Sequence, residues 1–180
     1  MLRGGGEPRA TRPCVSEGLG CFLAAIAGCE AVGGLGALVS VSGIREWLPT
    51  LDQPRLQPPD SVFGPVWTVL YATIGISWRL THLESASAER RSAERWLAVE
   101  LVLNALWSYI FFGRRRIGWA LVDSAALLTA VCISVVKVRR VNPLASRLLV
   151  PYLAWVAFAT GLNAALWRRN RTQSGGLAVG

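Results

Sequence analysis

The chain has 180 residues, of which 52% are hydrophobic, with a mean hydropathy of +0.39 and a formal net charge of +8. The apolar residues form long runs joined by short connections, which leaves no room for a separate soluble domain. The basic residues gather where these runs end, and no nucleic-acid-binding motif accompanies them, so the charge indicates helix ends at lipid headgroups and no nucleic-acid partner.

Five apolar segments predict an all-α integral membrane protein, multi-pass and built as a five-transmembrane-helix bundle. The expected helices cover 18–44, 61–81, 95–113, 117–138 and 146–168, within a membrane domain over 17–170. The flanking tails, 1–16 and 171–180, have the composition of disordered termini. A slight excess of basic residues on the N-terminal side favours a cytoplasmic location for that side.

The first expected helix carries a stripe of small residues at four-residue spacing: Ala25, Cys29, Gly33 and Ala37. Small residues at this spacing let helix backbones approach closely. The stripe therefore indicates either packing within the bundle or a dimer seam, and the spacing is equally compatible with both.

Three carboxylates fall inside the apolar runs: Glu30, Glu100 and Asp123. Ionisable groups within a span usually face protein or a wet cavity, so each is a candidate functional residue. No nearby residue in the sequence suggests a proton relay, and there is no nucleophile–base arrangement. The four cysteines and one histidine show no metal-ligand spacing, so we expect no metal site and no required cofactor.

The second expected helix begins with a proline-rich, aromatic segment at 58–71. Prolines suit the approach and first turn of a helix, where a missing N–H costs little. Trp67 and Tyr71 are four residues apart and therefore share one helical face. This face suits either a flat apolar ligand or another helix.

Aromatic residues and amides recur at helical spacing on the later helices. Asn104 and Trp107 lie three residues apart in the third helix, and Trp119 and Asp123 lie four apart in the fourth. The fifth carries a single stripe: Tyr152, Trp155, Ala159, Leu162 and Asn163. An apolar cavity between these helices, with a few amide donors, would suit a flat hydrophobic ligand.

Several of these motifs stand in the order and spacing of one known family. They are Trp47 with Leu51, Pro54 and Pro58-Pro59; Gly64-Pro65-Val66-Trp67 with Leu70-Tyr71; Leu103-Asn104 with Trp107; Gly118-Trp119 with Asp123; and Pro151-Tyr152 with Trp155 and Leu162-Asn163. On these residues the chain, from about 33 to 170, resembles the translocator protein (TspO/MBR) family, also called tryptophan-rich sensory proteins or peripheral-type benzodiazepine receptors.

The resemblance implies a five-helix membrane bundle, usually a homodimer, whose pocket binds protoporphyrin-type tetrapyrroles, sterols and synthetic benzodiazepine-site ligands. The pocket candidates carried over by position are Phe63, Trp67, Asn104, Trp107, Trp119, Val122, Ala126, Trp155, Ala159 and Leu162. The loop 46–60 would act as a lid, with Trp47, Leu51, Pro54, Pro58 and Pro59 as its matching residues.

The chain departs from the family pattern at several positions. Leu48 and Leu56 stand where loop aromatics are common, and Glu100 replaces the usual glutamine of the third helix. Ala164 and Ala165 stand where animal members carry the tyrosines of a sterol-recognition pattern. The departures favour tetrapyrrole over sterol binding.

We therefore expect a membrane protein that binds protoporphyrin IX or haem-related tetrapyrroles and acts in their transport, sensing or homeostasis. Its expected partners are the lipid bilayer, a hydrophobic small molecule and a second copy of the chain. The alternatives are light-dependent porphyrin degradation with Trp67 and Trp155 as the photochemical residues, sterol binding or transport, and a membrane interaction scaffold that uses the small-residue stripe.

Overall fold

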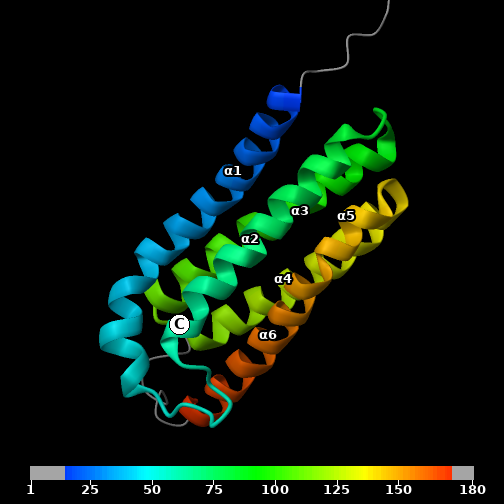
Figure 1. Ribbon diagram of the computed structural model, residues 1–180. Coiled ribbons are helices and arrows are strands. Elements are labelled where there is room, and N and C mark those ends of the chain that lie inside the picture. The colour runs from blue at the N-terminus through cyan, green and yellow to red at the C-terminus, as the bar shows by residue number, and fades with distance from the viewer. Residues whose placement is uncertain (1–14, 172–180) are drawn as a thin grey trace, which may run out of the picture.

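The computed structural model describes residues 15–171, so nearly all of both predicted tails lies outside the described residues. Between those limits the chain is helical and contains no strand. Five long helices run alternately up and down (Figure 1): α1 (Val15–Ser42), α2 (Asp60–Leu83), α3 (Ala88–Ser108), α4 (Ile117–Val141) and α6 (Val150–Asn170). The fold class is therefore all-α, as predicted, while the outer domain boundaries at 17 and 170 stay a prediction.

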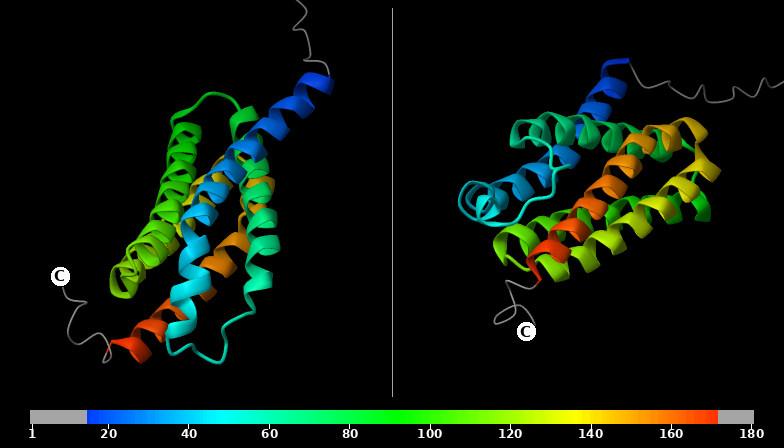
Figure 2. Two further views of the ribbon diagram at one scale, coloured as in Figure 1. Left: turned by 90° about the vertical axis from the view of Figure 1, so that its left-hand side faces the viewer. Right: turned by 90° about the horizontal axis from the view of Figure 1, so that it is seen from below.

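Neighbouring helices in the chain are also neighbours in space for most of the bundle. α1 packs along α2, α3 along α4, and α4 along α6. The start of α1 and the end of α6 lie at opposite ends of the bundle, and the loop between α1 and α2 lies beside the end of α6 (Figure 1). The view from below in Figure 2 looks onto this loop end.

Four helical stretches within 15–171 are long and apolar enough to cross a membrane: Gly18–Thr50, Ala88–Gly113, Ile117–Val141 and Pro143–Asn170. α2 has comparable length, 24 residues, but it is not among them. Its uncharged core mixes glycine, proline, hydroxyl residues and aromatic rings with the aliphatic ones, and this lowers its mean hydropathy. These four helices support a membrane protein, and α2 is not counted among the spans.

The structure corrects the predicted start of the third helix. α3 begins at Ala88, not at residue 95, because the Ser87 hydroxyl accepts a hydrogen bond from the Arg90 backbone N–H at 3.0 Å and caps the helix. The first turns contain Glu94 and other charged residues, so a prediction from hydropathy alone begins the helix too late along the chain. Charged turns of this kind extend a helix beyond its apolar part.

The last helical segment is also divided where a single helix is predicted. A short helix, α5 (Pro143–Leu148), precedes α6, with Leu149 between them. Asn142 caps α5 by accepting a hydrogen bond from the Ala145 N–H at 3.0 Å, and Pro143 occupies the first turn. The chain therefore turns at residues 142–149 before α6 runs back toward the loop end.

The interior is packed mainly by aliphatic side chains. Ile74, Leu97 and Val131 are fully buried. The outward faces are apolar too: Leu38 is 74% exposed and Val102 is 66% exposed. Helices that are apolar on all sides are typical of a membrane environment, in which lipid covers the outward face.

Candidate ligand pocket

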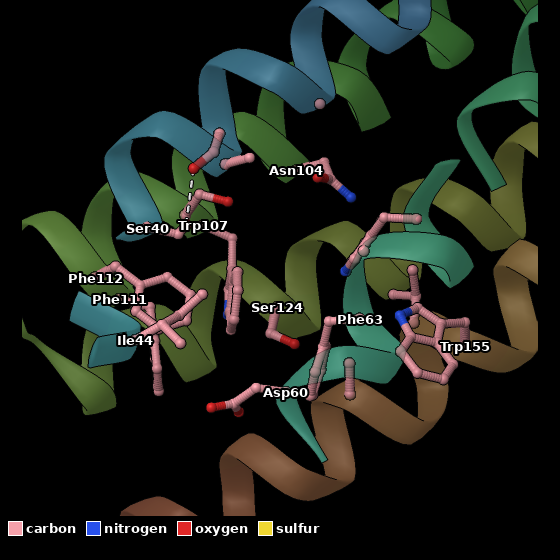
Figure 3. A pocket seen from close by; sticks show the side chains of 18 of the residues that line it. Ser40, Ile44, Asp60, Phe63, Asn104, Trp107, Phe111, Phe112, Ser124 and Trp155 are labelled. Atoms are coloured by element: carbon pink, nitrogen blue, oxygen red, sulfur yellow. Dashed lines mark hydrogen bonds between the residues drawn. The ribbon is translucent and has the colours of Figure 1, made fainter. Parts of the chain in front are cut away.

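A cavity of about 460 Å³ lies between α1, α2, α3, α4 and α6. Figure 3 shows side chains from several helices converging on it. Volumes of 300–1,000 Å³ are typical of small-molecule sites, as are walls of apolar and aromatic residues with few polar groups. The cavity has both properties and is the candidate functional site.

A buried hydrogen-bond chain holds three helices together beside the cavity. The Tyr71 hydroxyl donates to Asn104 Oδ1 at 2.7 Å, and Asn104 Nδ2 donates to the Tyr152 hydroxyl at 3.1 Å. Asn104 and Tyr71 line the cavity, whereas Tyr152 is fully buried behind it. Because each member has a partner, the chain fixes the relative positions of α2, α3 and α6.

Aromatic rings form much of the pocket wall. Phe63 and Trp155 meet edge to face with ring centroids 5.9 Å apart, and Trp67 lies 5.5 Å from Tyr71. In Figure 3, Phe63 lies between Trp155 and Trp107. Trp107 belongs to a second group of rings, in which it stacks on Phe111 at a centroid distance of 4.9 Å and an interplanar angle of 12°. Such rings offer flat apolar faces to a ligand.

The loop end of the bundle closes over one side of the cavity. The chain stays helical after α1 through η1 (Gly43–Trp47), a π-helical turn, and η2 (Leu48–Thr50), a 3₁₀ turn. The irregular part of the predicted lid is therefore shorter than expected, at residues 51–59. Leu48, at 5% exposure, and Gln57 line the cavity from this side.

A polar contact fastens the loop to the end of α6. Asn170 Oδ1 accepts a hydrogen bond from the Asp52 backbone N–H at 3.0 Å, and Asn170 Nδ2 donates to the Asp52 carbonyl at 3.2 Å. The Asp52 carboxylate also lies 3.2 Å from a guanidinium nitrogen of Arg169. Asn170 is only 2% exposed, so the hydrogen bonds to its amide are protected from water.

The structure brings seven of the ten predicted pocket residues to the cavity: Phe63, Trp67, Asn104, Trp107, Trp155, Ala159 and Leu162. Trp119, Val122 and Ala126 do not line it, in contrast to the expectation. Trp119 and Val122 are each 60% exposed on the outer face of α4, and Ala126 is exposed as well. α4 presents Ser124 and Leu127 to the cavity instead.

The five predicted lid residues have different surroundings. Trp47 packs edge to face on Phe111 at a centroid distance of 5.2 Å, and Leu51 packs against the same apolar cluster. Pro54 is buried, Pro58 lines a separate shallow groove, and Pro59 directly precedes α2. None of the five is among the residues that line the cavity.

The small-residue stripe of α1 contacts the inside of the bundle. Gly33 lies against the ring of Tyr71, and a Cβ added there would overlap that ring. The backbone of Ala25 lies against Gly75 of α2, Cys29 is buried in the core, and Ala37 lines the cavity. Ala25, Cys29 and Gly33 therefore pack within one chain, whereas Ala37 is exposed.

The C-terminal half of α1 supplies pocket residues that were missing from the prediction. Ser40, Val41 and Ile44 line the cavity, together with Ser108 and Phe112 from the other side. The glycines and small residues that precede Ser40 were the available signal, because they bring α1 close to α2 and α3.

The three intramembrane carboxylates take different positions. Glu30 lines the cavity, Glu100 is fully buried in the core, and Asp123 is 7% exposed. Within residues 15–171 no group of three or more potential metal ligands is assembled.

The comparison with known proteins decides the family. The profile of the TspO/MBR family matches residues 25–168. The chain belongs to the TspO/MBR family. It is 40% identical to the translocator protein of Homo sapiens over 164 residues, which cover 90% of each chain. It is 34% identical over 149 residues to the tryptophan-rich protein TspO of Archaeoglobus fulgidus, covering 83% of this chain and 96% of that one.

A third TspO/MBR relative is the tryptophan-rich sensory protein of Cereibacter sphaeroides, 33% identical over 150 residues that cover 83% of this chain and 90% of that one. The resemblance inferred from the motifs is thereby confirmed. TspO/MBR membership, together with the four apolar helices, supports an integral membrane protein.

Proposed function

We propose that this TspO/MBR protein binds tetrapyrroles such as protoporphyrin IX in the cavity between its helices and acts in their transport, sensing or homeostasis. The observation that carries the proposal is the aromatic-walled cavity of about 460 Å³, which is lined by seven of the ten residues matched to the family's pocket. A large flat ring system fits walls of this kind because it buries apolar area against the aromatic faces.

The proposal includes five membrane spans, with α2 as the fifth. α2 has 24 residues, about 36 Å at 1.5 Å per residue, which is enough to cross a hydrocarbon core. It packs along α1 over much of its length, and its residues Leu70, Ile74 and Ser77 are buried by protein. Because protein covers this face, α2 needs less overall hydropathy than a helix surrounded by lipid.

The span of α2 is testable with single cysteines in a background without other cysteines. Leu56→Cys lies in the lid loop and Ala86→Cys in the connection between α2 and α3. In sealed vesicles of uniform orientation, a membrane-impermeant maleimide should label only one of the two until the vesicles are opened. Equal labelling of both positions in sealed vesicles would refute a spanning α2.

Ligand binding is tested by titrating the purified full chain in detergent with protoporphyrin IX and following the porphyrin's own fluorescence. Trp67→Leu and Trp155→Leu should each raise the dissociation constant by about tenfold, because each removes an aromatic face from the cavity wall. Trp119→Leu is the matched control, since Trp119 is 60% exposed on the outer face of α4 and should leave binding unchanged.

The porphyrin proposal would be refuted if binding did not saturate, or if the Trp67, Trp155 and Trp119 variants all bound like the parent. The homodimer stays a separate proposal.

A further inference from the structure

The charges around the cavity are of one sign. Among the residues that line it, the charged side chains are Glu30 and Asp60, and both are acids. No lysine, arginine or histidine of the described chain lines the cavity, although the full chain has 19 lysines and arginines. A carboxylate that entered this space would lose its hydration and find no cation to replace it.

The two acids lie toward opposite ends of the cavity. Asp60 is the first residue of α2, at the lid end, and Figure 3 shows it at the far side from Asn104. Glu30 lies one turn before Gly33, which contacts Tyr71. Tyr71 follows Asp60 by eleven residues, about 16 Å along the helix. Neither end of the cavity therefore carries a cation that would pair with an anionic group.

The cavity wall does offer uncharged hydrogen-bonding groups. Asn163 is 2% exposed and lines the cavity, and neither atom of its amide has a hydrogen-bond partner among residues 15–171. The indole N–H of Trp155, which also lines the cavity, is likewise without an acceptor in the described part of the chain. Buried polar groups without partners are costly, so a ligand that pairs with them gains affinity.

We propose that the pocket selects its ligand by charge, and that it takes uncharged flat molecules with carbonyl, ester or ring N–H groups and disfavours buried carboxylates. Asn163 and Trp155 supply the hydrogen bonds, and Asp60 and Glu30 oppose anions. The inference rests on the proposed function. For a tetrapyrrole it means that the macrocycle enters the cavity while ionised propionates remain outside, so a porphyrin with masked carboxylates binds more tightly.

The test compares protoporphyrin IX with its dimethyl ester, which has the same ring and no ionisable propionate. Both are titrated into the purified full chain in detergent. The ester should bind about tenfold more tightly, because like charges brought together at a site are costly. The two porphyrins partition differently into micelles, so the ratio of their dissociation constants is compared between variants that share the same detergent.

Asp60→Asn should lower the ratio of the free acid's dissociation constant to that of the ester by about fivefold, because it removes a like charge from the cavity wall. Glu30→Gln tests the other end in the same way, so the result does not depend on the folding of one variant. Glu46→Gln is the control, because Glu46 is exposed in η1 and does not line the cavity, and it should leave the ratio unchanged.

Two outcomes would overturn charge selection while porphyrin binding stands. One is a ratio that neither Asp60→Asn nor Glu30→Gln changes, and the other is a ratio that Glu46→Gln changes as much as they do. Absence of saturable binding for both porphyrins is a different result, because it would overturn the proposed function itself.

Discussion

At Gly75, α2 packs directly against the backbone of α1. A Cβ built on Gly75 would lie 2.7 Å from the Cα of Ile26 and 2.9 Å from both the Ile26 nitrogen and the Ala25 carbonyl oxygen. All three atoms are backbone, so no side-chain rotation relieves the overlap. Ordinary contact begins at 3.4 Å, which means that α1 must recede by roughly 0.7 Å to accept an alanine.

We expect Gly75→Ala to destabilise the bundle. Overpacking of this kind costs about 1–3 kcal/mol, and the better helix propensity of alanine returns about 0.5–1 kcal/mol, so the net loss lies between about 0 and 2.5 kcal/mol, with a central value of about 1.3 kcal/mol. For a chain of this size the central value corresponds to a fall of about 3–5 °C in the midpoint of thermal unfolding, measured in detergent by circular dichroism.

Gly161→Ala is the matched control for Gly75→Ala. Gly161 also lies inside a long helix, α6, but an added Cβ meets no atom within 4 Å. Its midpoint should equal or slightly exceed that of the parent. A Gly75→Ala midpoint at or above the parent value, or an equal fall in both variants, would show that the contact between α1 and α2 is not limiting.

Two further predictions concern the polar contacts. Tyr71→Phe removes the donor to buried Asn104 Oδ1 and should lower the free energy of unfolding by about 1–3 kcal/mol. Tyr109→Phe is the control, because Tyr109 is 48% exposed and its loss should not lower that free energy. Equal unfolding curves for the two variants would contradict the role of the Tyr71 hydroxyl. Asn170→Ala removes both amide contacts to the Asp52 backbone and should speed tryptic cleavage after Arg55, in loop 51–59, by roughly 5–30-fold. Asp52→Ala is the control, because it keeps those backbone groups and loses only an exposed ion pair. Cleavage of Asp52→Ala as fast as that of Asn170→Ala would contradict the role of the amide.

The sequence predicts the helices well because long uncharged runs admit few alternatives in a membrane. Their ends are harder to predict, because a helix continues past the lipid wherever capping allows it. Ser87 starts α3 seven residues before the predicted position, at a turn rich in charged residues. The π-helical and 3₁₀ turns after α1 similarly shorten the irregular loop, since the chain keeps local hydrogen bonds through Thr50.

The residues of α4 that line the cavity differ from those predicted, and the reason is physical. A helix apolar on all sides has no hydrophobic stripe to separate its protein face from its lipid face. The spacing of Trp119 and Asp123 suggested one common face, yet Trp119 is exposed and Asp123 is buried. Ser124 was the better signal, because its hydroxyl pairs with Thr160 of α6 at 2.7 Å and turns that side of α4 inward.

Leu48 shows how a departure from the family pattern affects the pocket. It occupies a position where a loop aromatic is common, and it is 5% exposed and lines the cavity at the lid end. Its side chain brings apolar surface but no hydrogen-bond donor to an end whose charged group is Asp60. A ligand carboxylate at that end would therefore meet an acid, a hydrocarbon and the uncharged amide of Gln57 but no cation, which gives the proposed charge selection a basis in the lid as well as in the helices.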